Sequence, residues 1–246
     1  MSDREARPAA DRGPEAGQEH GRSLNHFAWY GFNARYWDLP REEQSNILSA
    51  WLTGLQGAAA RVHFYQVFPA EANTDVLVWS AVAAPDPQDA AAFFGSLARA
   101  AVPHRRFVEP RAVLWGFTAG SVYSKGRSTQ EVDPFLPARR RYLVVYPFAK
   151  TTEWYLLGPE VRQGMMNEHI RIGKQYPAIH QLLLYSSGLQ DQEFVVVYET
   201  DDLMQFSDLV RQLRSTEVRR YTLRDTPVSA AVHRPAEEIL SMWGTP

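Results

Sequence analysis

The sequence predicts an α+β fold in which two ferredoxin-like units form one β-barrel with the helices outside. Two observations lead to this prediction. The order strand, helix, strand, strand, helix, strand occurs twice, over segments of similar length. In each copy the helices carry an apolar face that covers one side of a sheet, and the strands leave the other side apolar, so that the two bare sides bury each other. We therefore expect a first unit over 24–124, a linker over 125–139 and a second unit over 140–246.

The composition indicates a soluble globular protein with a tail. Hydrophobic residues make up 45% of the 246 residues, whereas residues 1–23 are rich in charge, Ala, Gly and Pro and predict a disordered tail. The net charge of −2 gives no drive toward nucleic acid. No Cys is present, which excludes disulfides and thiolate metal sites. No apolar run is long enough for a membrane span or a secretory signal, so we expect a cytoplasmic protein.

Turn and cap signals place the elements of the first unit. Asp86 is expected to cap a helix that has Pro87 at its first position. Apolar residues at helical spacing mark the helix before it, and short apolar runs mark the strands. The expected elements are a strand over 26–36, a helix over 41–56, strands over 62–68 and 76–82, a helix from residue 86 and a strand over 112–117.

The second unit repeats this order. Pro147 is expected to end its first strand, because proline donates no hydrogen bond to a ladder. Asp202 is expected to cap its last long helix. The expected elements are a strand over 142–146, a helix over 159–176, strands over 179–185 and 194–198, a helix from residue 202, a strand over 228–232 and a short final helix over 236–243.

Two ionisable residues interrupt apolar helix faces in the second unit. His169 takes a position where packing favours Leu, and Glu217 continues the apolar stripe of the last long helix. Burying either group alone is costly, so we expect the imidazole N–H to be donated to the carboxylate, an arrangement that orients a histidine toward a metal. The alternative is a satisfied core histidine and a solvated glutamate. The stripe that contains the histidine is Val161, Met165, His169, Ile172 and Tyr176.

Haem is the metal group that a single histidine serves most economically. The other histidines are scattered, and no zinc, phosphate-loop, nucleophile-elbow or dinucleotide motif is present. A tetrapyrrole brings four nitrogen ligands and needs only one from the protein. Tyr146 at a strand end and Lys150 just beyond it suit a porphyrin with carboxylate arms, and Gln181 is an amide among apolar neighbours. The alternative is a core-edge tyrosine and a surface lysine.

Several separated motifs of the second unit resemble the chlorite dismutase-like superfamily. They are YPFAKTTEWYLL, RQGMMNEHIRIGKQYP, SSGLQDQEFVVVYETDDLMQF and LVRQLRSTEVRRYTLRDTP, and the first unit agrees more loosely through HFAWYGFNARYW and TDVLVWSA. The superfamily includes haem-dependent chlorite dismutases and coproheme decarboxylases. The resemblance implies a duplicated ferredoxin-like barrel that assembles as a homo-oligomer, a pentamer.

The resemblance also implies a role for individual residues. His169 matches the ligand of the haem iron, and Glu217 matches the carboxylate that orients this ligand in true chlorite dismutases. Tyr146 matches the tyrosine that becomes a radical in coproheme decarboxylases. Lys150 matches the lysine beside a reactive propionate, and Trp154 matches a pocket tryptophan.

Gln181 favours one activity over the other. It matches the distal position, which holds Arg in chlorite dismutases and Gln in one group of decarboxylases. A cationic donor suits an oxyanion such as chlorite better than a neutral amide does. We therefore expect peroxide-driven oxidative decarboxylation of coproheme III to haem b, with coproheme and hydrogen peroxide as substrates. The alternatives are a chlorite dismutase or peroxidase-like haem enzyme and a non-catalytic ligand-binding barrel.

The sequence departs from the decarboxylase group at the propionate contacts. Arg219, expected to touch the cofactor, takes the place of a small Ser. The group's additional propionate-binding Arg has only Arg127 and Arg139 as candidates, and GLQD replaces the usual GLDD. The orientation of the substrate is therefore left open by the sequence.

Overall fold

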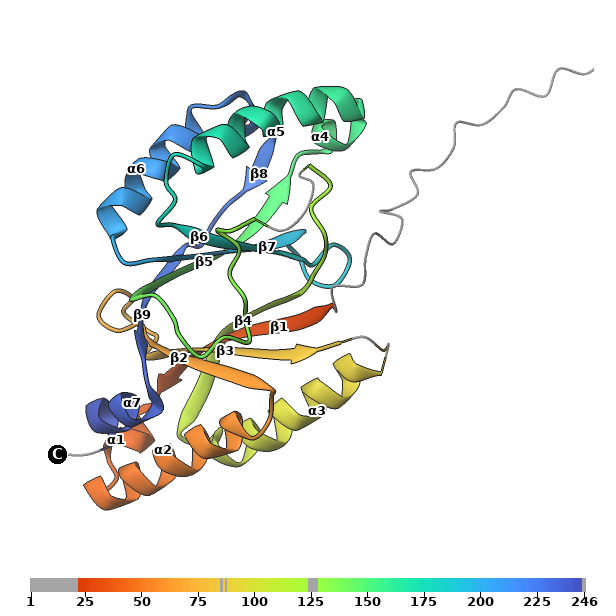
Figure 1. The fold of residues 1–246 in the computed structure, drawn as a ribbon. Coiled ribbons are helices and arrows are strands. Elements are labelled where there is room, and N and C mark those ends of the chain that lie inside the picture. Colours follow the sequence, from red (N-terminus) through yellow and green to blue (C-terminus); the bar gives the residue numbers. More distant parts are fainter. Residues whose placement is uncertain (1–21, 85, 87, 124–127, 245–246) are drawn as a thin grey trace, which may run out of the picture.

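The computed structural model describes residues 22–84, 86, 88–123 and 128–244. Within this part the elements follow the predicted order (Figure 1). The first half contains β1 (Ser23–Phe32), α1 (Ala34–Trp37), α2 (Arg41–Gln56), β2 (Arg61–Gln66), β3 (Val76–Ala83), α3 (Asp89–Ala101), a 3-10 helix (Val102–His104) and β4 (Val108–Thr118). The second half contains β5 (Tyr142–Lys150), α4 (Thr152–Leu156), α5 (Pro159–Gly173), β6 (His180–Tyr185), β7 (Phe194–Thr200), α6 (Leu203–Arg214), a 3-10 helix (Glu217–Tyr221), β8 (Thr222–Arg224), β9 (Ser229–Arg234) and α7 (Ala236–Trp243).

The strands form a closed antiparallel ring. Their order is β7-β6-β4-β1-β3-β2-β9-β5, and β5 pairs back to β7, while β8 pairs with the end of β5. The pairs β4–β6 and β2–β9 join the two halves at both edges. Closure removes the open edges that each half would otherwise expose. The structure thus confirms the α+β class and the barrel of two ferredoxin-like halves with helices outside.

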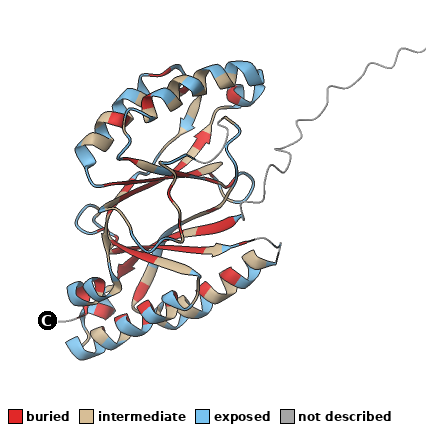
Figure 2. Ribbon diagram, in the orientation of Figure 1, coloured by how far each residue is buried: buried red, intermediate tan, exposed pale blue. Residues whose placement is uncertain are grey.

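Alternation along the strands separates an inner core from two outer layers. Residues such as Phe27, Trp79, Leu143 and Val197 point inward and pack in one cluster inside the ring. The other side of each strand faces the helices: α2 and α3 cover the first half, and α5 and α6 lie over the second half (Figure 1). Buried residues therefore gather on the strands and on the inner sides of the helices (Figure 2).

The two outer layers differ in how firmly they are packed. Helix α2 buries five side chains against the sheet, whereas α5 buries only Ile172. On the strand face below, Leu183 of β6 remains 43% exposed. The outer face of the second half therefore keeps apolar surface that its helices do not cover.

Two local predictions in the first half need correction. The first strand ends at Phe32, because the side chain of Asn33 accepts a hydrogen bond from the backbone N–H of Tyr36 and starts α1. Asp86 does not cap α3: the helix starts at Asp89, whose carboxylate instead accepts the backbone N–H of Asp86. Pro87 lies outside the described residues.

The start of the first strand and the end of β5 also differ from the prediction. Ser23, expected in the tail, is the buried first residue of β1, while residues 1–21 lie outside the described part. Pro147 does not end β5, which continues to Lys150. Along one edge, β5 pairs with β9 up to Val145 and with β8 from Ala149 onward. Pro147 lies between these two pairings, where no backbone N–H is needed for a hydrogen bond to a neighbouring strand.

No helix in the described residues is long and apolar enough to cross a membrane.

Candidate functional site

Three neighbouring strands bring the predicted strand residues onto one face. In the antiparallel pairing, Tyr146 of β5 lies opposite Val196 of β7, and Gln181 of β6 lies opposite Tyr198 of β7. Paired residues point to the same side of a sheet, and their strand neighbours Leu182 and Val197 belong to the inner core. Tyr146 and Gln181 therefore share the outer face, below α5 and α6.

His169 lies on α5, above this face. Its Nδ1 is buried and has no hydrogen-bond partner among the described residues. Burial, and to a smaller extent the nearby Lys150 ammonium, lower the pKa of His169 to about 4. The ring is neutral at pH 7 as a result, so it holds the free lone pair that a metal ligand requires.

Lys150 ends β5 on the same outer face. Its Nζ lies 4.3 Å from the ring centroid of Trp154 and 5.1 Å from that of Phe148, in cation–π contact with both. Burial lowers the pKa of Lys150 to about 8; Glu193 opposes this shift and Arg219 adds to it. The ammonium makes no ion pair with a carboxylate in the described chain, which leaves it available to an anionic group.

Trp154 forms an aromatic wall beside Lys150. It is buried on α4, and its ring lies 5.8 Å from that of Tyr221 and 6.4 Å from that of Tyr123. Arg162 on α5 adds a second cation near this wall, and its buried Nε has no hydrogen-bond partner in the part of the chain that the structure describes. Since buried polar atoms in proteins are normally paired, the orphaned atoms of His169 and Arg162 indicate a site built for another molecule.

Tyr146 is half-buried beside Tyr198, with 6.4 Å between the ring centroids. Burial raises the pKa of Tyr146 well above its usual value, so the phenol keeps its proton at neutral pH.

The donors fit a metal that carries its own equatorial ligands. No group of three or more His, Cys, Asp or Glu in the described chain could hold a bare ion. One neutral imidazole, an unpaired ammonium, an aromatic wall and an uncovered apolar strand face instead match a flat macrocycle with carboxylate arms. The residues present therefore fit a haem-type group.

A family model decides the relationship. The model described as chlorite dismutase matches residues 33–233, which is most of the chain. The chain belongs to the chlorite dismutase family. This confirms the resemblance inferred from the motifs of the second half.

Similar proteins include members of this family with two different names. A coproheme decarboxylase of Staphylococcus saprophyticus is 30% identical over 216 residues, covering 77% of this chain and 85% of that protein. A coproheme decarboxylase of Mycolicibacterium smegmatis is 33% identical over 100 residues, or 41% of this chain, and the match spans only 43% of that protein. Among solved structures, a chlorite dismutase variant from Candidatus Nitrospira defluvii has a TM-score of 0.78 at 22% identity, covering 92% of this chain and 97% of that one.

Glu217 does not pair with His169 in this family member, contrary to the prediction. Helix α6 ends at Arg214, so the apolar stripe stops before Glu217, which starts a separate 3-10 helix. The carboxylate is half exposed and lies 3.3 Å from Arg220 in an ion pair. Arg219, by contrast, lies close enough to affect Lys150, although its guanidinium pairs with Asp225 at 2.5 Å.

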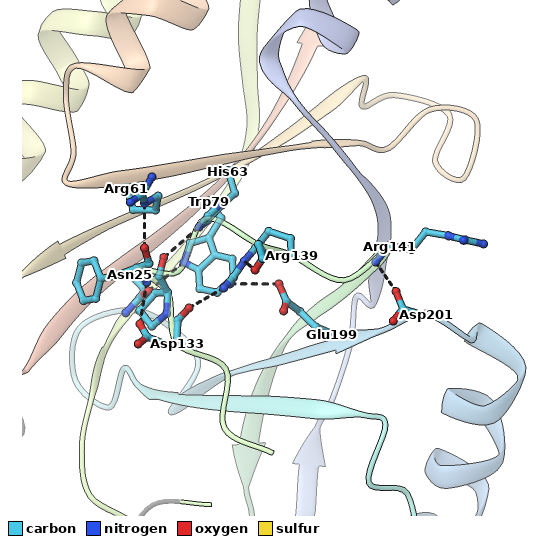
Figure 3. A network of polar contacts seen from close by, with 12 residues as sticks. Asn25, Arg61, His63, Trp79, Asp133, Arg139, Arg141, Glu199 and Asp201 are labelled. Carbon is cyan, nitrogen blue, oxygen red and sulfur yellow. Dashed lines mark hydrogen bonds and ion pairs between the residues drawn. The ribbon is translucent and has the colours of Figure 1, made fainter. Parts of the chain in front are cut away.

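Arg139 is not a propionate contact in this structure. Its side chain lies inside the barrel, 3.3 Å from Glu199 in a buried ion pair and over the ring of Trp79, and it donates to the carbonyl of Asp133 (Figure 3). The inner core separates it from the outer face. The other candidate, Arg127, lies outside the described residues.

Sequence reasoning missed two residues of the site. The carboxylate of Glu193 accepts both the backbone N–H of Lys150 at 2.7 Å and the hydroxyl of Tyr155 at 2.6 Å, which fixes the end of β5. No periodic pattern marks Glu193, because it precedes β7. Tyr198 is two residues after Val196 on β7, so both side chains point to the same side of the sheet. This period of two could have placed Tyr198 on the site face from the sequence.

Proposed function

We propose that this chain is a haem-dependent oxidoreductase that converts coproheme III to haem b by oxidative decarboxylation driven by hydrogen peroxide. The observation that carries the proposal is one arrangement among the described residues: a neutral imidazole on α5, whose Nδ1 has no hydrogen-bond partner there, lies near an ammonium that forms no ion pair there. The two relatives named coproheme decarboxylase support the choice of substrate. The bound group supplies the redox chemistry of iron and the propionates that react.

His169 and Lys150 would bind the substrate at two points. His169 would donate its lone pair to the iron, since its ring is neutral at pH 7. The Lys150 ammonium would pair with a propionate carboxylate and set the rotation of the macrocycle about the iron axis. The apolar ring would lie against the uncovered face of β6 and the ring of Trp154.

The reaction balances with one peroxide for each propionate. The side chain –CH2–CH2–COO⁻ becomes –CH=CH2 and CO2, losing one hydrogen atom from the carbon next to the macrocycle. Hydrogen peroxide and one proton take up the two electrons and this hydrogen, giving two waters. Two rounds convert two propionates of coproheme to the vinyl groups of haem b. The phenol of Tyr146 stays protonated and reaches the outer face, and peroxide oxidation at the bound group would remove one electron and one proton from it. The resulting tyrosyl radical would take the hydrogen atom from the propionate, which restores the phenol, and the remaining electron would pass to the bound group as CO2 leaves.

Gln181 supports decarboxylation over chlorite degradation. Its backbone is held on both sides, by N–H donation to the carbonyl of Gln130 and by acceptance from the N–H of Val132. The backbone of Gln181 is therefore held on the site face, and its side-chain amide would offer a neutral donor to peroxide. An oxyanion substrate would gain more from a cation.

Mass spectrometry tests this proposal. Coproheme is added to the protein, hydrogen peroxide is titrated in, and the tetrapyrrole is weighed after each addition. We expect successive loss of two carboxyl groups, with the loss abolished in Tyr146→Phe and retained in Tyr142→Phe, a matched change on the same strand. Bound coproheme of unchanged mass, or equal turnover in Tyr146→Phe, would contradict the proposal. Oxygen released from chlorite would instead indicate chlorite chemistry.

We also propose that the protein is a homopentamer in the cytoplasm, as the family resemblance implies. Light scattering on the purified protein gives the number of subunits directly, and any mass other than five chains contradicts the pentamer.

A further inference from the structure

Tyr198 lies between the two strand residues of the proposed site. It pairs directly with Gln181 of β6 on one side and with Val144 of β5 on the other. Tyr146 is two residues further along β5, which makes it the diagonal neighbour of Tyr198 on the same face. The three side chains therefore lie next to one another on the outer face of β5, β7 and β6.

The ring of Tyr198 packs beside that of Tyr146. Tyr198 is only 6% exposed, its ring lies nearly parallel to that of Tyr146, at an angle of 25°, and it also contacts Phe206 at 5.2 Å. Burial raises the pKa of both phenols, that of Tyr198 to about 12, and the two phenols lie near enough to influence each other, which raises the pKa of Tyr146 further and lowers that of Tyr198. Both groups therefore keep their protons at neutral pH.

A phenol is an unusual choice for this position unless the hydroxyl has a task. Phe would fill the same space next to Phe206 and would bury no polar atom. A buried hydroxyl costs free energy unless it finds a hydrogen-bond partner, and here the phenol beside it belongs to the residue that reacts in the proposed function.

We propose that Tyr198 is a positioning residue, which holds the hydroxyl of Tyr146 in place and fixes its direction relative to the bound macrocycle. This rests on the proposed function, because Tyr146 is the residue that would take hydrogen from a propionate. Tyr198 itself does not touch the reacting atoms in this proposal; it acts through Tyr146.

The ligand-free protein provides a first test. The tyrosine doublet in ultraviolet resonance Raman spectra reports the hydrogen bonding of a phenol. Two difference spectra isolate the contribution of Tyr146. The first is the wild-type spectrum minus that of Tyr146→Phe, and the second is the spectrum of Tyr198→Phe minus that of the double variant with Tyr146→Phe. We expect this contribution to change in Tyr198→Phe and to stay as in the wild type in Tyr142→Phe. An unchanged contribution in Tyr198→Phe overturns the proposal.

Loaded protein provides the second test. Tyr198→Phe should bind coproheme as tightly as the wild type but decarboxylate it about three- to tenfold more slowly, as loss of one hydrogen bond predicts. An unchanged rate overturns the positioning role. A rate that falls only because affinity falls assigns Tyr198 to packing and overturns it too. If the wild-type protein does not decarboxylate coproheme, the proposed function fails and the role falls with it, while the Raman result still decides whether the two phenols are coupled.

Discussion

Burial sets the charge of both basic residues in the site. It lowers the pKa of His169 to about 4 and that of Lys150 to about 8. The imidazole is then neutral and the lysine is still mostly charged at pH 7, the combination that coordination of iron and capture of a carboxylate require.

The first prediction concerns the charge of Lys150. Because only the ammonium attracts a carboxylate, the affinity for coproheme should fall as pH rises through about 8. Lys150→Met should bind about ten- to a hundredfold more weakly at pH 7, as expected for loss of a charged hydrogen bond, and should lack this pH dependence. Lys150→Arg should hold its affinity to higher pH. Fluorescence titrations at several pH values measure this, and a wild-type affinity that is flat from pH 7 to 9.5 would argue against the contact.

The second prediction concerns the stability of the ligand-free protein in acid. His169 is neutral in the folded state down to about pH 4 but binds a proton near pH 6.5 when unfolded. The unfolded state therefore binds more protons in this window, and the free energy of unfolding should decrease as pH falls from about 6.5 to 4. Burial also lowers the pKa values of His26 and His63, so these residues contribute to the same dependence of unfolding free energy on pH. Urea unfolding should show a shallower slope for His169→Gln, and an identical slope would mean that the ring is accessible to protons in the fold.

The elements of the chain show where pattern reasoning succeeds. The helices over 41–56 and 236–243 have the predicted bounds, because each carries a clear apolar stripe. Asp202 caps α6 as predicted, accepting the N–H groups of Met204 and Gln205. Local periodicity and capping suffice at these places.

Other features depend on contacts that no local pattern contains. The strand through Pro147 continues because two different partner strands meet there, and the separation of Glu217 from His169 follows from the end of α6 at Arg214. The site face itself was predictable in part: Tyr146 and Gln181 follow from alternation. Lys150 was expected beyond the strand and in fact ends it, and the place of His169 above the face requires the packing of α5.

The third prediction concerns α5 as an element. It buries only Ile172, whereas α2 buries a full stripe, so α5 should open more readily in the ligand-free protein. Hydrogen exchange followed by mass spectrometry should show faster exchange in α5 than in α2, and coproheme should slow exchange in α5 alone. Equal protection of the two helices before and after loading would show that the face below α5 is already closed.

At the scale of the whole molecule, a buried ion pair joins the halves. Arg139 from the segment between the halves pairs with Glu199 of β7 and lies over Trp79 of β3 (Figure 3). The sequence gives no sign of this contact, because the three residues are far apart along the chain and meet only when the ring closes.

The fourth prediction follows from that pair. Arg139→Ala leaves a buried carboxylate without its partner and should cost about 3–5 kcal/mol of unfolding free energy. Arg211→Ala removes an exposed pair with Asp208 on α6 and should cost under about 1 kcal/mol. Urea unfolding at pH 7 measures both. Similar small losses for the two variants would contradict the role of the pair, and separate transitions for the two halves would contradict a single cooperative barrel.

The central claim is that His169 binds the iron of a tetrapyrrole from inside the outer layer of the second half. An absorbance titration of the protein with ferric coproheme measures this directly. The account predicts a shifted, saturable Soret band at one coproheme per chain, lost in His169→Ala and kept in His104→Ala, a matched change in the first half. A wild-type Soret band that persists unchanged in His169→Ala, or no band at all, would contradict it.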